Sequence, residues 1–277
     1  AKNTFLVPPI WGRIGKSADK LDKELIFKWI NHRVLFRQRW GYKRGKQDAA
    51  KFLKYEDEVV EPIYQALKEE LVDKDIFDPI AIYAYYPCIS WDNKIYIFDK
   101  KYLFNSLEEA KNVPPLSEAI KVLEFPRQKR KPFRCIADFF ANDRLDVIAF
   151  TLASAGLKIS DYERSLYDKG EFTKYYQVHG LGVELAEALA EVLHKQIRLD
   201  LDIVPKEGHT LNDVQMKQYV GCRYSPGYAA CPDLAMNRDI FDLLNPEEFG
   251  IELSETFQMH PEQTTCAIVV THKEANY

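Results

Sequence analysis

Ile80-Ala81-Ile82-Tyr83-Ala84-Tyr85-Tyr86 is a run of apolar and aromatic residues of the kind that forms a buried β-strand. A second run of this kind is Lys94-Ile95-Tyr96-Ile97-Phe98, and the residues between the two runs include Trp91-Asp92-Asn93, which favour a turn. The two runs are therefore predicted to form a β-hairpin, so the sheet contains antiparallel pairing.

Helices and strands follow one another irregularly along the rest of the chain. Helices are predicted at Leu21–Trp40, Glu56–Leu71, Leu181–Arg198 and Asn237–Leu244, strands at Val147–Leu152 and Thr265–Val270, and mixed structure at Cys135–Ala141. Because strands and helices do not alternate regularly, we expect the α+β class rather than a doubly wound α/β fold. No linker or repeat is present, so we expect a single domain, residues 1–277, with a twisted antiparallel sheet flanked by helices.

The composition excludes several classes of protein. The chain has 277 residues, 46% of them apolar, but no run approaches the ~18 to 20 apolar residues of a membrane span. Lys plus Arg at 38 against Asp plus Glu at 42 leaves a net charge of −4, without the basic excess of a duplex DNA-binding protein. Five widely spaced cysteines with no Cys-x-x-Cys pair fit a reducing compartment. We therefore expect a cytoplasmic protein with no nucleic-acid or membrane partner. One explanation for the start at Ala1 rather than Met is excision from a longer polypeptide.

Several motifs of nucleotide binding and catalysis are incomplete or missing. His179-Gly180-Leu181-Gly182 and Gly12-Arg13-Ile14-Gly15-Lys16 lack the full glycine spacing of a dinucleotide or phosphate loop. The six histidines include no pair at metal-binding spacing, and no nucleophile motif exists, so we expect neither a metal site nor a catalytic side chain. The basic run Arg127–Arg134 is either a solvated loop or a contact for a phosphate or an acidic partner.

The segment Gly221–Asp233 is the most unusual part of the chain. It reads Gly-Cys-Arg-Tyr-Ser-Pro-Gly-Tyr-Ala-Ala-Cys-Pro-Asp, so two Pro, two Gly and two Tyr surround Arg223. Proline restricts the backbone and glycine lets it approach a ligand closely. The segment is therefore a candidate cradle for a small flat molecule.

This segment closely resembles the Arg-x-x-x-Gly-Tyr-x-x-Cys-Pro-Asp/Glu signature of the C-terminal activation domain of cobalamin-dependent methionine synthase. Further segments are similar to that family in the same order, namely Pro8–Gly12, Leu35–Tyr42, Cys135–Phe139, Leu185–His194 and Leu253–Pro261. The resemblance spans essentially the whole chain and implies the fold of that activation domain.

The resemblance also implies a function. In this family the domain binds S-adenosylmethionine and supports the reductive methylation of cob(II)alamin to methylcobalamin, which reactivates methionine synthase. The cobalamin is carried by the cobalamin-binding domain, and flavodoxin or an equivalent reductase supplies the electron. The domain would belong to a methyltransferase, with no complete active site of its own. Two alternatives are a noncatalytic docking module and a standalone reactivator for another corrinoid methyltransferase.

The family's ligand-binding residues can be transferred to matching positions. The resemblance implies that Arg223 binds the ligand, that Tyr224, Ser225 and Gly227 wrap the nucleoside, and that Tyr228 lies near the cobalamin face. Glu187 matches a helix Glu near the ligand, although it lies with Glu184, Glu191 and Lys195 opposite a leucine stripe and could belong to a solvated face. Tyr277 matches a Tyr that contacts the ligand.

Two family acids are missing from this chain. Some members place an Asp where this chain has Asn31-His32, so His32 or Asn31 would have to substitute in holding the ligand's amino group. A second acidic position corresponds to Lys217. We therefore expect ligand affinity or pose to differ from those of other members.

Overall fold

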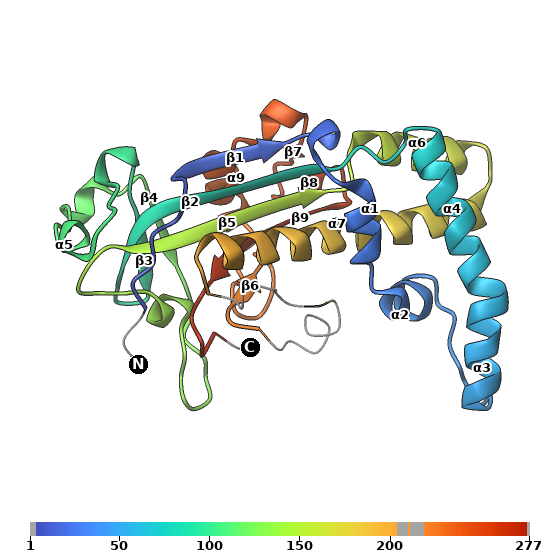
Figure 1. Cartoon of the computed structure of the whole chain (residues 1–277), viewed down its shortest axis with the longest axis horizontal. Helices are drawn as coiled ribbons and strands as arrows, with labels where there is room; N and C mark the ends of the chain where they lie inside the picture. Colours follow the sequence, from blue (N-terminus) through green and yellow to red (C-terminus); the bar gives the residue numbers. More distant parts are fainter. Residues whose placement is uncertain (1–3, 204–209, 211–218, 276–277) are drawn as a thin grey trace.

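The computed structural model describes residues 4–203, 210 and 219–275. Its main feature is a sheet of seven strands in the order β4-β3-β2-β5-β9-β6, with β1 also paired to β2 (Figure 1). The strands are β1 (Gly12–Lys16), β2 (Ile80–Trp91), β3 (Lys94–Ile97), β4 (Lys121–Glu124), β5 (Asp146–Ser154), β6 (Cys222–Tyr224) and β9 (Thr264–Val270). All of these pairings are antiparallel, and β7 (Glu252–Leu253) and β8 (Met259–His260) form a separate small pair. The predicted α+β class is confirmed.

Helices cover both faces of the sheet, with α7 in front of it and α9 behind it in Figure 1. The helices are α1 (Lys23–Lys28), α2 (His32–Val34), α3 (Ala49–Tyr55), α4 (Glu61–Asp73), α5 (Leu107–Ala110), α6 (Leu157–Asp168), α7 (Phe172–Asp200) and α9 (Met236–Leu244). Single 3-10 turns lie at Ala18–Lys20, Lys100–Tyr102, Leu116–Glu118, Ile136–Phe139 and Pro246–Phe249, and π-helical turns at Leu35–Arg39 and Glu56–Val60. No helix in the described ranges is long and apolar enough to cross a bilayer.

The central strands are buried on both faces, which explains their nearly continuous apolar sequence. Tyr83 and Tyr85 of β2 pack in the core on the α7 side, whereas Ile82 and Ala84 pack in the core on the α9 side. Successive side chains of a strand point to opposite faces, so one strand supplies both cores. The hairpin is confirmed, with Trp91 paired to Lys94 across Asp92-Asn93.

Several predicted elements have different bounds in the structure, among them the first predicted helix and the first predicted strand. The helix expected over Leu21–Trp40 is interrupted, because Asn31 begins α2 by accepting a hydrogen bond from the Val34 amide at 3.2 Å. The strand predicted at Ile80–Tyr86 is β2, which continues through Pro87 to Trp91. Pro87 falls between Tyr85, which pairs with β1, and Cys88, which pairs with β3. A proline is tolerated there because the neighbouring strand changes at that point.

The helix α7 begins nine residues earlier than the predicted Leu181, at Phe172. The glycines of His179-Gly180-Leu181-Gly182 lie inside this helix, where a Cβ on Gly180 would come within 2.9 Å of Trp40. They therefore serve close packing of the helix, not a nucleotide loop.

Candidate functional site

Arg223 is held at the middle of β6, the edge strand beside β9. It pairs with Val269 of β9, and Gly221 precedes the strand with a φ of +96°. A Cβ on Gly221 would lie 2.5 Å from the Val270 carbonyl oxygen, so a side chain at this position would push β6 away from β9. Glycine is thus required for the strand to bring Arg223 to its place.

The Arg223 side chain contacts two carboxylates of α7. Its Nη2 donates to Glu191 Oε1 at 2.5 Å and lies 3.7 Å from Glu187 Oε2. The two glutamates are one helical turn apart, so both project toward the same strand. The Arg223 side chain is 17% exposed and that of Glu191 is 22% exposed, which shields the pair from solvent.

The acidic side of α7 is therefore not a solvated face. Glu184 is buried and accepts a hydrogen bond from Arg39 Nε at 2.8 Å. Burial raises the pKa of Glu184, and the Arg39 contact opposes that rise. Glu187, the most exposed of the three acids, lies at the site beside Arg223.

The loop after β6 folds back on itself at Gly227. The Gly227 amide donates to the Cys231 carbonyl at 2.8 Å, and the Cys231 amide donates to the Tyr228 carbonyl at 2.9 Å. Gly227 has a φ of +91°, a conformation that glycine adopts without strain. The turn leaves Tyr228 71% exposed, whereas Tyr224 is buried.

A cavity of about 770 Å³ lies between α7, β6 and this loop. It brings together five of the predicted site residues, which are Glu187, Arg223, Tyr224, Ser225 and Tyr228. Gly227 does not line the cavity but shapes the turn between Ser225 and Tyr228.

The cavity also contains residues that the sequence did not single out for the site, which are Glu191, Tyr219, Thr265, Lys273 and Ala275. Glu191 could have been found, because it follows Glu187 by one helical turn. Lys273 and Tyr219 carry no such signal, since only the path of the chain brings them to α7. Lys273 adds a second cationic group to the cavity.

Behind the cavity wall lies a buried cation, Arg198. Its guanidinium stacks over the Tyr219 ring at 4.3 Å from the centroid, and among the described residues none of its side-chain nitrogens has a hydrogen-bond partner. Burial lowers the pKa of Arg198 to about 10. The cation–π contact fixes the ring that forms one wall of the cavity.

The remaining predicted residues are not brought to this cavity. His32 lies on α2, where its Nδ1 is 3.3 Å from Glu61 Oε2 and its ring packs 4.5 Å from that of Tyr64. It borders a different pocket, and Figure 1 shows α2 well separated from β6. The structure thus separates Asn31 and His32 from Arg223. Tyr277 and Lys217 lie outside the described residues.

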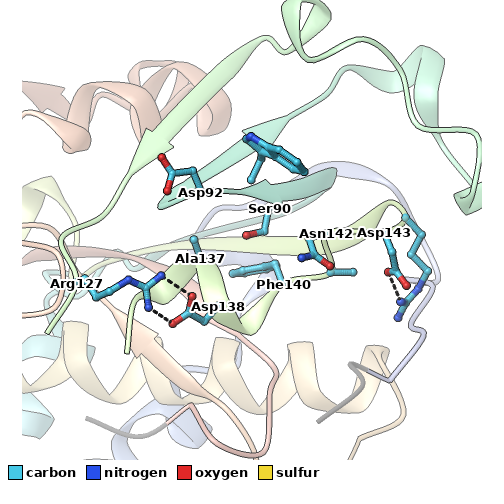
Figure 2. A pocket seen from close by; sticks show the side chains of 11 residues that line it. Ser90, Asp92, Arg127, Ala137, Asp138, Phe140, Asn142 and Asp143 are labelled. Atoms are coloured by element: carbon cyan, nitrogen blue, oxygen red, sulfur yellow. Dashed lines mark hydrogen bonds and ion pairs between the residues drawn. The ribbon is translucent and has the colours of Figure 1, made fainter. Parts of the chain in front are cut away.

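A second cavity, of about 900 Å³, lies by the β2–β3 turn. Figure 2 shows Arg127 and Asp138 facing each other at one side of it, with Asn142 and Asp143 at the other. Arg127 donates two hydrogen bonds to Asp138, at 2.7 and 2.8 Å. Burial alone would raise the pKa of Asp138, but Arg127 holds it below its usual value. The first charge of the run Arg127–Arg134 is thus paired within the fold.

Comparison with known proteins identifies the family. The family model described as vitamin B12 dependent methionine synthase, activation domain, matches residues 26–277. Methionine synthase of Mycobacterium tuberculosis is 35% identical, over 98% of this chain and 23% of that protein. Methionine synthase of Mycobacterium leprae is 34% identical, over 98% of this chain and 22% of that protein. The chain therefore spans about a quarter of the length of these relatives.

The fold is also that of a solved structure. A crystal structure described as the MetH reactivation domain bound to AdoHcy superimposes with a TM-score of 0.80 and 23% identity, covering 99% of this chain and 82% of that chain. The antiparallel sheet and its flanking helices thus agree with the family that the sequence matches. The chain belongs to the family of activation domains of vitamin B12-dependent methionine synthases.

Proposed function

We propose that residues 1–277 are one activation domain that binds S-adenosylmethionine in the cavity between α7 and β6. The domain would act in the cytoplasm and support the reductive methylation of cob(II)alamin to methylcobalamin. The cobalamin would be carried by the cobalamin-binding domain of a methionine synthase, and flavodoxin or an equivalent reductase would supply the electron. This chain would then be one module of a methyltransferase, without a complete active site of its own.

One observation carries this proposal. Arg223 and Tyr228 of the Arg-x-x-x-Gly-Tyr motif line a cavity that also holds carboxylates, so Arg223 and Glu187 meet there although they are far apart in sequence. S-adenosylmethionine has a carboxylate, an ammonium and a sulfonium, and the cavity offers groups of both charges. The solved structure with this fold is described as bound to AdoHcy, the product of methyl transfer from this ligand.

The chain's own residues would bind and orient the methyl donor. Arg223 would anchor the polar end of the ligand, while the turn at Ser225 and Gly227 would follow the nucleoside. Tyr228, exposed at the border of the cavity, is placed to meet the partner domain. Cobalamin bound to the partner domain would supply the nucleophile for the methyl group, and this chain would hold the S-adenosylhomocysteine that remains until it is released. Alignment of donor and acceptor needs no nucleophilic side chain from this chain.

Calorimetric titration of the chain with S-adenosylmethionine tests the proposal. We expect binding that Arg223→Gln weakens about 10- to 100-fold, because a hydrogen bond to a charged group is lost. The matched control is Arg164→Gln, which removes the same charge from an exposed position on α6. A ligand at ~100-fold excess over Kd should also stabilise the chain by about 2.7 kcal/mol.

Other outcomes favour the alternatives. No heat and no thermal shift at millimolar S-adenosylmethionine would refute the proposal and favour a noncatalytic docking module. If the chain binds the ligand but supports remethylation only on another corrinoid protein, it is a reactivator for that methyltransferase. We expect the chain alone to bind cobalamin weakly, because it lacks the Asp-x-His-x-x-Gly pattern of cobalamin-binding domains.

A further inference from the structure

The cavity of about 900 Å³ by the β2–β3 turn, here called the turn cavity, shares no lining residue with the cavity between α7 and β6. Its walls carry three aspartates and two arginines, together with Trp91. Figure 2 shows Asp92 on one side of the turn cavity, Asn142 and Asp143 on the other, and Ser90 between them. The turn cavity is thus a separate candidate site, and the groups that remain unpaired decide what it can bind.

Both arginines of the turn cavity are bonded within the fold. An arginine side chain has five N–H donors. Arg127 uses all of them, because two bond to Asn93 Oδ1, two to Asp138 and one to a backbone carbonyl, at 2.7–3.2 Å. Arg144 donates to Asp143 Oδ1 at 3.1 Å, and its side chain is only 13% exposed. An anion entering the cavity would therefore have to displace a carboxylate that is already bonded.

Acceptors of the turn cavity remain unused. The Asp92 carboxylate is exposed and makes no hydrogen bond or ion pair with another described residue. Ser90 is only 7% exposed, and its side chain points into the cavity without a hydrogen-bond partner in the described chain (Figure 2). A buried hydroxyl normally has a partner, because leaving it unpaired costs free energy. The cavity thus offers a free carboxylate and a free hydroxyl to a ligand that donates hydrogen bonds.

Trp91 adds an open aromatic face beside these acceptors. It is the most exposed of the four tryptophans, at 60%, and it lines the turn cavity. Ser90, Trp91 and Asp92 are consecutive, so the hydroxyl, the ring and the carboxylate arise within about 7 Å of backbone. A guanidinium is planar and weakly hydrated, so it stacks on an aromatic ring while its N–H groups pair with a carboxylate. An ammonium is a compact, strongly hydrated point charge and suits this combination less well.

We propose that the turn cavity binds a guanidinium group, which stacks on Trp91 and donates to Asp92 and Ser90. This inference does not rest on the proposed function, because S-adenosylmethionine has no guanidinium and the two cavities are lined by different residues. The group belongs either to a free alkylguanidine or to an arginine of a peptide chain. Both present the same planar cation to the cavity.

Calorimetric titration of the full chain with N-acetyl-arginine amide tests the site. The matched ligand is N-acetyl-citrulline amide, which has the same shape but a neutral urea in place of the guanidinium. We expect saturable binding of the arginine ligand, about 10-fold or more tighter than that of the citrulline ligand, because the bond to a charged donor is lost. Binding should also shield Trp91 from quenching by acrylamide. Saturating S-adenosylmethionine should leave this affinity unchanged.

Substitutions assign the contacts. Asp92→Asn removes the charge and keeps the turn, because Asp92 has a φ of +55° and asparagine is favoured at positive φ in two-residue hairpin turns. It should weaken the arginine ligand about 10-fold. Trp91→Thr should weaken it about 2- to 5-fold, and Trp91→Tyr should recover most of that loss. The matched control is Asp168→Asn, which removes an exposed carboxylate at the end of α6 and should leave the affinity within about twofold.

Two further probes identify the source of the guanidinium. Tighter binding of the tripeptide acetyl-Gly-Arg-Gly-amide than of ethylguanidinium indicates an arginine of a peptide chain. Equal or tighter binding of ethylguanidinium indicates a free alkylguanidine. Either result supports the site, provided that Asp92→Asn weakens the probe.

Several results would overturn the proposal. If no saturable heat appears up to about 10 mM, tenfold above the Kd of a ~1 mM site, the cavity does not bind the group. If the citrulline ligand binds equally well, or if Asp92→Asn weakens binding no more than Asp168→Asn does, the cavity does not recognise the cation. If S-adenosylmethionine competes, the arginine ligand occupies the other cavity. Failure of S-adenosylmethionine to bind would refute the proposed function alone and leave this inference standing.

Discussion

Replacing Gly221 by alanine tests whether the backbone before β6 sets the site. Gly221 has a φ of +96°, and an added Cβ would lie 2.5 Å from the Val270 carbonyl oxygen and 3.3 Å from the Thr271 Cα. Both atoms belong to the backbone, so no side chain can rotate away to relieve the contact. The substitution must therefore shift β6 relative to β9.

The expected cost has two parts. A non-glycine residue in the left-handed region costs about 1–2 kcal/mol. Forcing an extra methyl group against packed backbone adds about 1–3 kcal/mol. We thus expect Gly221→Ala to lower the free energy of unfolding by about 2–5 kcal/mol. Because Arg223 follows two residues later, S-adenosylmethionine affinity should fall as well.

Gly170→Ala isolates the first part. Gly170 also has a positive φ, +75°, but no atom of the described part of the chain lies within 4 Å of an added Cβ. Gly170→Ala should therefore lower the free energy of unfolding by the backbone strain alone, about 1–2 kcal/mol, and leave S-adenosylmethionine affinity unchanged. Urea unfolding of the wild type and both variants measures the difference. If Gly221→Ala destabilises the chain no more than Gly170→Ala does, the contact with Val270 does not constrain β6 and the reasoning is refuted.

Three further predictions concern the core, pH and ligand charge. Leu185→Ala on the buried side of α7 should cost about 2–5 kcal/mol in urea unfolding, because Leu185 is fully buried in the core; a loss below 1 kcal/mol would mean that α7 does not anchor the sheet. Burial raises the pKa of Asp78 to about 6 from 3.8, so the folded state binds more protons than the unfolded state in this window and stability should fall as pH rises from about 4 to 6. Urea unfolding at several pH values gives the free energy of unfolding of the wild type and of Asp78→Asn, which keeps an acceptor for the Lys158 amide. The difference between the two should show this slope with pH, and an equal pH dependence of both proteins would contradict the prediction. Lys273→Gln removes a cation from the cavity, so calorimetry should show S-adenosylmethionine gaining a few-fold in affinity at low salt relative to S-adenosylhomocysteine, whose sulfur carries no charge. An unchanged ratio of the two affinities would place Lys273 too far from the sulfonium to matter.

Much of the fold follows from local patterns. The strands β2, β5 and β9 are continuous apolar runs, and α9 has a clear amphipathic pattern closed by Asn245-Pro246, so periodicity alone predicts them. The short strands β1, β4 and β6 were not predicted. Gly12–Lys16 and Cys222–Tyr224 have little strand character of their own, and they are extended because a neighbouring strand supplies their hydrogen bonds.

Part of the candidate site, like part of the fold, could be predicted from local sequence, and the rest could not. Arg223, Tyr224, Ser225 and Tyr228 lie close together in the chain, at β6 and the turn after it, so a local motif was enough to predict them as a group, and the structure places them around one cavity. His32 was grouped with them by resemblance, but the break before α2 leaves it beside Glu61 and Tyr64. Glu191 had been assigned to a surface pattern, since helical spacing shows which residues share a face but not what that face meets.

The sequence by itself determined the α+β class, the main strands and the motif around Arg223, because these depend on periodicity and on residues that are neighbours in the chain. Only the tertiary structure decided that the acidic side of α7 faces β6 and that Arg223 pairs with Glu191. That contact joins residues 32 positions apart, and it forms because α7 packs on the sheet whose edge carries β6. Its electrostatic strength depends on burial, which a linear sequence does not contain.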